Sequence, residues 1–322
     1  MLGPAYWTLD SRLRGNERNM LQGAAMTGAL DYIQFVLAPQ VLVGLALGVA
    51  VILVALGLTI IFGLLDVINM AHGEFYALGA FVALALGAIG LPFFVLLALV
   101  PLLMLPVGYI VERGLIQRVF HSGDRHVTTL LLTFGLGLVM EDAFRLVFGP
   151  NPHRPETPIR GAVEVLGIFL PLYRVFLIAI GAAIIAAVAF VIYRTRLGTM
   201  VRAAAFDRHM AASLGVPVQR VYAGAFAFGI ALAGLAGVLL APIYSVFPTM
   251  GRDFILLAFT VVIVGGIGSV AGVVVAGLAL TQVQAISSLY ISPVWSDPIV
   301  FAIMVVMLML RPQGLFGRLG HG

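Results

Sequence analysis

The sequence predicts an all-α fold, a polytopic bundle of about eight transmembrane helices with two glycine-rich segments that are broken or re-entrant. Of the 322 residues, 61% are hydrophobic and only 10% are charged, whereas a soluble domain holds roughly a quarter charged residues. The apolar stretches accommodate about eight spans of ~20 residues and leave no room for a separate soluble domain. They are continuously apolar rather than alternating, which excludes an outer-membrane β-barrel.

The first predicted span covers residues 41–62, and a segment dense in polar groups follows it at 63–80. Polar side chains at that density are costly in lipid, so we expect a broken helix that faces the protein interior. An ordinary turn at the membrane surface is the alternative. The polar residues are Asp66, Asn69, His72 and Glu74, and Gly73 lies between the last two. We predict that all five belong to the broken helix that lines the pathway.

Further spans are predicted at residues 75–91, 92–111, 127–147, 175–193, 221–240 and 297–310. Residues 254–290 are too long for one span of ~20 residues, and the run GGIGSVAG interrupts them. Glycine at that density breaks a helix and lets backbone groups face a cavity. One interrupted segment in each half of the chain indicates a transport pathway between the two halves. The alternative is that both segments are simple hairpin turns. The glycines of the second segment are Gly265, Gly266, Gly268 and Gly272.

Residues 194–220 carry five arginines and one acid, Asp207, between two long runs that hold no charge. The arginine excess predicts that this segment lies on the cytoplasmic side. Apolar residues recur in it at roughly helical spacing, so we expect a short amphipathic helix that ends at Gly215 and offers a docking surface. A solvated loop that only fixes orientation is the alternative. The apolar positions are Val201, Ala204, Ala205, Met210, Ala211 and Leu214.

Composition and motifs argue against an enzyme. The chain has no cysteine and no lysine, so it lacks thiolate chemistry and the lysine of an ordinary phosphate-binding loop. Any ATP-driven work must therefore come from a partner. His72-Gly73-Glu74 is not an H-E-x-x-H zinc motif, and the chain has no G-x-S-x-G elbow. We expect no catalytic residue, metal, cofactor or nucleic-acid partner.

Four stretches together resemble a known family. They are GLTIIFGLLDVINMAHGEFYALGA, RAAAFDRHMAASLGVPVQRVYAGAFAFGIALAGLAGVLL, VVIVGGIGSVAGVVVAGLAL and the closing RPQGLFG. In this order they are similar to the membrane subunit of ABC importers for branched-chain amino acids, the LivH type. The resemblance covers residues 35–317 as one permease domain. It leaves residues 1–34 as an N-terminal extension and 318–322 as a C-terminal tail.

The resemblance implies a multi-pass permease in the lipid of the inner (cytoplasmic) membrane that forms the translocation pathway for branched-chain (hydrophobic) amino acids. It also implies four further subunits: a LivM-like permease, two cytoplasmic ABC ATPases and a periplasmic substrate-binding protein. The family pattern N-F-A-H-G-E is present at residues 69–74 with Met70 in place of phenylalanine. The family's ATPase-coupling segment matches here, which assigns that role to Arg202, Asp207, Met210, Ala211, Leu214 and Gly215.

Three other functions stay open at this point. Importers of urea and short-chain amides use similar permeases, so the substrate is not fixed. An ion-coupled secondary transporter would use Asp66, His72 and Glu74 as a relay and would need no ATPase. The third alternative is a scaffold subunit that stays passive beside an active partner permease.

Overall fold

The computed structural model describes residues 32–119, 124–165 and 168–317. The predicted C-terminal tail and all but the last three residues of the predicted N-terminal extension lie outside these ranges. In the described residues, five helices are long and apolar enough to cross a membrane, and two shorter apolar helices accompany them. The prediction of an α-helical multi-pass membrane bundle is confirmed at this level. One antiparallel hairpin of β1 (Ala162–Val165) and β2 (Ile168–Pro171) was not predicted.

Two helices form the centre of the bundle, α2 (Ala38–Leu65) and α10 (Val218–Leu240). A short π-helix, η1 (Ile33–Leu37), precedes α2. Every residue of α2 from 48 to 61 is buried, which suits an uncharged helix rich in small and β-branched side chains. The helices cross at Gly57 and Gly229, where a Cβ on either glycine would collide with the carbonyl oxygen of the other. Glycine therefore sets the distance between the two central helices.

The two halves of the chain repeat the same packing pattern. The helix α4 (Phe93–Val111) packs on α10, and α12 (Val270–Tyr290) packs on α2. Between them lie two shorter helices, α3 (His72–Ala88) and α11 (Met250–Gly265), which contact each other. The series α2–α3–α4 thus corresponds to α10–α11–α12, as in transporters built from internal repeats.

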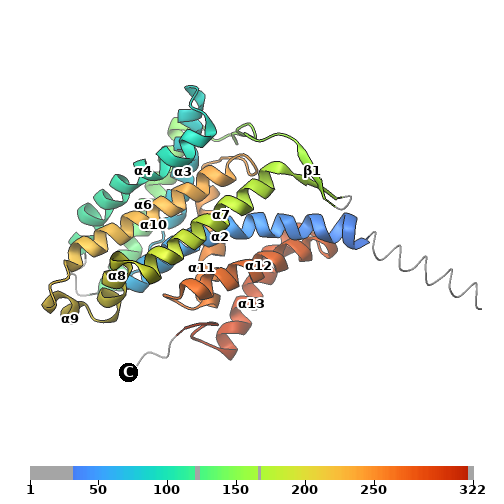
Figure 1. Ribbon diagram of the computed structural model, residues 1–322. Coiled ribbons are helices and arrows are strands. Elements are labelled where there is room, and N and C mark those ends of the chain that lie inside the picture. The colour runs from blue at the N-terminus through green and yellow to red at the C-terminus, as the bar shows by residue number, and fades with distance from the viewer. Residues whose placement is uncertain (1–31, 120–123, 166–167, 318–322) are drawn as a thin grey trace, which may run out of the picture.

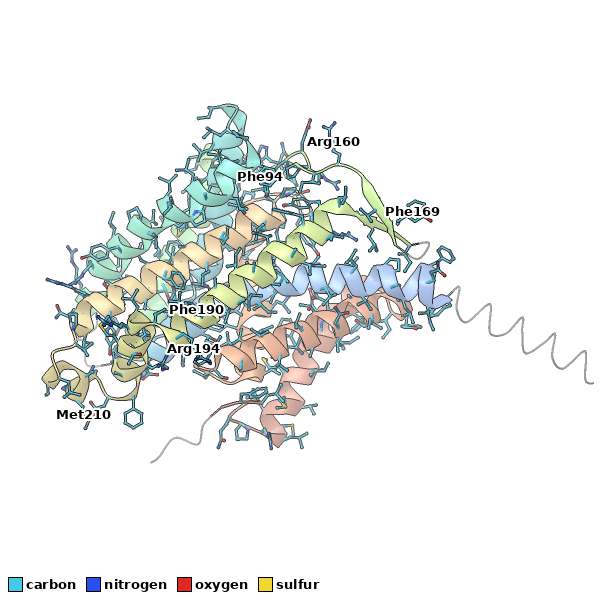
Figure 2. The ribbon with its side chains drawn as sticks, in the orientation of Figure 1. Phe94, Arg160, Phe169, Phe190, Arg194 and Met210 are labelled. Atoms are coloured by element: carbon cyan, nitrogen blue, oxygen red, sulfur yellow. The ribbon has the colours of Figure 1, made fainter. Side chains whose placement is uncertain are left out.

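The remaining elements surround this core and define two ends of the molecule. Figure 1 places α8 and α9 at one end and β1 at the opposite end; in Figure 2, Met210 marks the first end, and Arg160 and Phe169 lie toward the second. These elements are η2 (Glu112–Ile116), α5 (Gln117–Val119), α6 (Arg125–Phe148), α7 (Leu172–Arg194), α8 (Arg196–Phe206), α9 (Arg208–Ser213), η3 (Pro293–Trp295) and α13 (Ser296–Leu310).

The polar segment after α2 is an interruption inside the bundle. The helix α2 ends at Leu65, Asp66 takes a left-handed backbone conformation with φ 53°, and α3 begins at His72. His72 Nε2 lies 3.1 Å from the carbonyl oxygen of Val54, which precedes Leu65 by 11 residues, or roughly 17 Å of helix. Residues 66–71 therefore run back beside α2, and α3 begins in the middle of the bundle.

The GGIGSVAG run forms a tight turn between two helices rather than an interior break. The helix α11 ends at Gly265 and α12 begins at Val270. Gly266 and Gly268 have φ values of 99° and 79°, a region that glycine enters at no steric cost. The turn lies at the end of α2, since a Cβ on Gly63 would be 3.0 Å from the Cα of Gly268.

The interruption that matches residues 66–71 in the second half lies instead at residues 241–249, between α10 and α11. The sequence prediction is corrected here because this loop carries no glycine run. Its backbone is held by the segment between α6 and β1: His153 and Val246 exchange two backbone hydrogen bonds of 2.8 and 2.7 Å.

Candidate functional site

The first turns of α3 and α11 meet inside the bundle. Gly73 is the second residue of α3 and Gly251 the second of α11. A Cβ on Gly73 would collide with the Gly251 carbonyl oxygen and lie 2.8 Å from Cβ of Ile255. The absence of a side chain at Gly73 lets the two helix N-termini approach. Paired half-helix N-termini of this kind carry partial positive charge and are typical of substrate sites in transporters.

Three polar side chains of the first interruption are buried at this junction: Asn69, His72 and Glu74. His72 Nε2 contacts the Val54 carbonyl. Within the described residues, both polar atoms of the Asn69 side chain, His72 Nδ1 and Glu74 Oε2 have no hydrogen-bond partner. Unpaired polar groups inside a protein cost about 1–3 kcal/mol each. These unpaired groups at the meeting point of two half-helices make the junction the candidate functional site.

Charged residues from two other elements join Glu74. Arg145 Nη2 lies 2.8 Å from Glu141 Oε1 on α6, and Arg252 Nη1 on α11 lies 3.6 Å from Glu141 Oε2. Glu74, Glu141 and Arg252 line a small cavity of about 40 Å³. The sequence did not predict Glu141 and Arg252 as site residues. The available signal was a carboxylate within a span predicted to be apolar.

Asp66 does not belong to this cluster. Its side chain is exposed and lies 3.1 Å from Nη2 of Arg125 and 3.5 Å from Nε2 of His126, at the start of α6. His72 and Glu74 are buried in the bundle some 17 Å of helix away. The relay of Asp66, His72 and Glu74 that an ion-coupled transporter would require is therefore not assembled. Among the described residues, no group of three or more His, Asp or Glu could hold a metal ion.

The arginine-rich segment forms two helices where the sequence predicted one. Asp207 separates α8 from α9 with an extended backbone of φ −152° and ψ 108°. Its Oδ1 accepts hydrogen bonds from the backbone N–H groups of Met210 at 3.0 Å and His209 at 2.8 Å. These bonds, that of Met210 first, lower the pKa of the Asp207 carboxyl below its ordinary value. Asp207 is thus the N-cap that starts a second helix.

The two short helices α8 and α9 present apolar side chains on the surface of the molecule. Ala204 and Ala211 are buried, whereas Phe206 is 88% exposed, Met210 59% and Leu214 79%. We call Phe206, Met210 and Leu214 the apolar edge. The sequence prediction left out Phe206, although it precedes Met210 by four residues and Leu214 by eight, which is helical spacing.

The other predicted coupling residues hold this segment in place. Arg202 Nη1 donates to the carbonyl oxygen of Ile192 and fastens α8 to the end of α7. Gly215, with φ 85°, makes the turn after α9 that leads into α10. The segment is therefore anchored at both ends while its apolar edge stays free for contact.

Replacing Asp207 by alanine is expected to loosen α9 without unfolding the bundle, because only the local cap is lost. Hydrogen exchange of the amides at residues 209–213 should become faster, while exchange within α2 stays unchanged. The pKa of Asp207 is lowered by folding, so its contribution is complete above the ordinary pKa and lost as the pH falls through the folded value. The protection of these amides, measured against the exchange of an unstructured peptide at the same pH, should therefore fall at acidic pH in the unchanged protein. In the alanine variant it should not depend on pH in this way. Equal exchange in both proteins would contradict the capping role.

Comparison with known proteins identifies the family. A family model described as "Branched-chain amino acid transport system / permease component" matches residues 40–308. The chain is 31% identical to the LivH permease protein of Escherichia coli (strain K12) and 30% identical to that of Salmonella typhimurium. Both comparisons extend over 295 residues, 87% of this chain and 95% of the relative.

A more distant relative is the LivM permease protein of Escherichia coli (strain K12), with 27% identity over 290 residues, 82% of this chain and 67% of the relative. No solved structure gives a significant match. All three relatives are named as permease proteins of high-affinity branched-chain amino acid transport systems, which confirms the prediction of a transport subunit rather than an enzyme. The chain belongs to the family of branched-chain amino acid transport system permease components.

Proposed function

We propose that the chain is the membrane-spanning permease subunit of an ATP-driven importer of branched-chain amino acids. It forms part of the translocation pathway and couples to cytoplasmic ATPases. The relatives' names support the substrate class. The absence of lysine supports an energy source in a partner, since a phosphate-binding loop needs that residue.

The single observation that carries the coupling role is the apolar edge. Three large apolar side chains stand exposed at the polar end of a membrane protein, and exposed apolar clusters rimmed by polar residues mark protein contacts. The flanking arginines favour the cytoplasmic side for this end, which is where an ATPase can reach it. The proposed coupling residues are Arg202, Phe206, Asp207, Met210, Ala211, Leu214 and Gly215.

This orientation gives the topology. The helices α2, α4, α6, α7, α10, α12 and α13 each cross once. Residues 66–71 with α3, and 241–249 with α11, would supply two further passes. The proposed topology therefore has nine passes, where the sequence alone predicts about eight. The chain would enter α2 from the outer side and leave α13 in the cytoplasm, in the inner membrane of a bacterial cell.

The same proposal names the partners. The chain is similar to both LivH and LivM, which supports pairing with a second, LivM-like permease. Of two cytoplasmic ATPases, one would bind the apolar edge of this chain and the other the partner permease. A periplasmic binding protein would deliver substrate to the opposite end. The pathway residues we propose are the buried polar groups Asn69, His72 and Glu74 with Gly73 at the half-helix junction. Asp66 and the turn glycines at 265–272 are not proposed as pathway residues, because they lie at the end of the bundle where α2 ends.

Uptake by the reconstituted complex tests the proposal. Proteoliposomes that contain both permeases and both ATPases, with the cognate binding protein outside and ATP inside, should accumulate labelled leucine. Labelled urea at the same concentration should not accumulate above the level seen without ATP. Accumulation of urea but not of leucine would contradict the substrate and leave a short-chain amide importer.

A further inference from the structure

A second and larger cavity lies beside the half-helix junction. Its volume is about 350 Å³, and it lies between α2, α3, α11, α12, α13 and the 241–249 loop. Ligand sites of small molecules begin at roughly this size and combine an apolar lining with a few polar groups. The lining includes Leu47, Phe254, Leu256 and Phe301 as apolar residues, and Asp253 and Gln284 as polar ones.

Two charged residues of opposite sign stand side by side at this point. Arg252 and Asp253 are consecutive in the first turn of α11, and both are exposed. Arg252 lines the small cavity next to Glu141, whereas Asp253 lines the large one. Arg252 lies 13 residues, or roughly 20 Å, from the end of α11. A hydrocarbon core is about 30 Å thick, so both charges lie at membrane depth. Exposed charges at that depth face a polar route rather than lipid.

Building on the proposed function, we propose that the first turn of α11 recognises the zwitterion of the transported amino acid. Arg252 binds the α-carboxylate on the side of the small cavity, and Asp253 binds the α-ammonium at the mouth of the large one. The apolar side chain of the substrate occupies the large cavity. Specificity for a small zwitterion with an apolar side chain therefore resides partly in this chain.

The charged groups of the large cavity fit an ammonium group and disfavour a carboxylate. The lining includes the carboxylates of Asp253 and Asp297 but no arginine or histidine. Gln284 Nε2 donates to Asp297 Oδ1 at 2.6 Å, which leaves Gln284 Oε1 buried without a partner in the described residues. An unpaired acceptor requires a donor. The ammonium group supplies three donors, and a carboxylate supplies none.

The carboxylate side is equally distinct. The Arg252 side chain is 58% exposed, and its ion pair with Glu141 is a long one of 3.6 Å. Guanidinium groups bind carboxylates with two parallel hydrogen bonds. Glu74 is 96% buried, with Oε2 unpaired and close to Gly251. Glu141 thus holds Arg252 by charge without saturating its donors.

Cysteine labelling tests the site directly and without the binding protein. The chain has no native cysteine, so Leu256→Cys introduces one thiol into the cavity wall while keeping Arg252 and Asp253. In the assembled importer, a charged, membrane-impermeant methanethiosulfonate should modify this thiol. Leucine should slow the modification about tenfold. Val163→Cys, on a 41% exposed position of β1 outside the cavity, is the control: the reagent should modify it, and leucine should not protect it.

The role of each charge is separated with analogues and variants. Leucinamide lacks the carboxylate and 4-methylpentanoate lacks the ammonium group, so both should protect Leu256→Cys far less than leucine. Arg252→Gln or Asp253→Asn in the same background should abolish protection by leucine. Equal protection by 4-methylpentanoate and leucine would overturn the role of Asp253. No modification, or modification without protection, would overturn the site itself.

Uptake then links the site to transport. Arg252→Gln and Asp253→Asn should each lower ATP-driven leucine uptake at least tenfold. Asp124→Asn, an equivalent carboxylate-to-amide change at an exposed N-cap position before α6 that asparagine also fills, should change it less than twofold. If the unchanged importer takes up no leucine, the proposed function fails. If it does and all three variants resemble it, only the zwitterion site fails.

Discussion

Met210→Asp is expected to lower ATP-driven leucine uptake at least tenfold while the two permeases still assemble. Met210 is 59% exposed in the apolar edge, so an aspartate there can reach water in the isolated chain, and we expect the chain still to fold. Docking of an ATPase would bury the new carboxylate without a partner, which costs several kcal/mol. Each 1.4 kcal/mol is a factor of ten in affinity. The measurement is uptake alongside co-purification of the subunits.

The matched control for this change is Ala212→Asp. Ala212 is also exposed on α9, but it lies about 200° around the helix from Met210. It adds the same charge to the same helix and should keep most of the uptake. Equal losses from Met210→Asp and Ala212→Asp would indicate a general charge effect. Full uptake by Met210→Asp would contradict a docking role for the apolar edge. It would favour the alternative, in which the arginine-rich segment only fixes the orientation of the chain.

Gly57→Ala is expected to destabilise the fold strongly. The new Cβ would overlap the carbonyl oxygen of Gly229 and lie 3.1 Å from its Cα. Overpacking of a core costs about 1–3 kcal/mol when side chains can move. Here the obstacle is the backbone of the other central helix, so we expect the upper end of that range or more. A lower thermal unfolding midpoint and a smaller monodisperse fraction in detergent would report it.

Gly224→Ala provides the comparison for the glycine crossing. Gly224 lies on α10, like Gly229, but a Cβ there would meet nothing within 4 Å. Removing a flexible residue from an open helix position should be neutral or slightly stabilising. If Gly57→Ala unfolds at the same temperature as Gly224→Ala, the crossing of α2 and α10 does not depend on the close approach of the glycines.

The long apolar helices were predictable from sequence because a membrane imposes a minimum length on each of them. The predicted spans at 41–62, 92–111 and 221–240 correspond to α2, α4 and α10. The polar density at 66–74 also indicated the first interruption, since Asn69 and His72 have no place in lipid. These signals are local, and a single stretch of sequence contains them.

The site itself depends on contacts between distant segments. The sequence placed the second interruption at the glycine run, whereas the half-helix begins at Met250 after a loop of ordinary composition. Glu141 and Arg252 meet Glu74 only because α6 and α11 pack beside α3. The kink at Asp207 escaped prediction because the apolar spacing across it suited one continuous helix. An N-cap hydrogen bond decided that conformation, and spacing alone does not report it.

The energy source for uptake is the measurement that tests the importer most directly. Proteoliposomes with the complete complex and the binding protein outside are loaded with ATP or with a non-hydrolysable analogue, given an imposed proton gradient, and assayed with and without a protonophore. Our account predicts leucine accumulation with ATP alone, unchanged by the protonophore, and none with the analogue. Accumulation with the analogue that stops when the proton gradient collapses would contradict it, and Glu74 and His72 would then be the candidates for proton coupling.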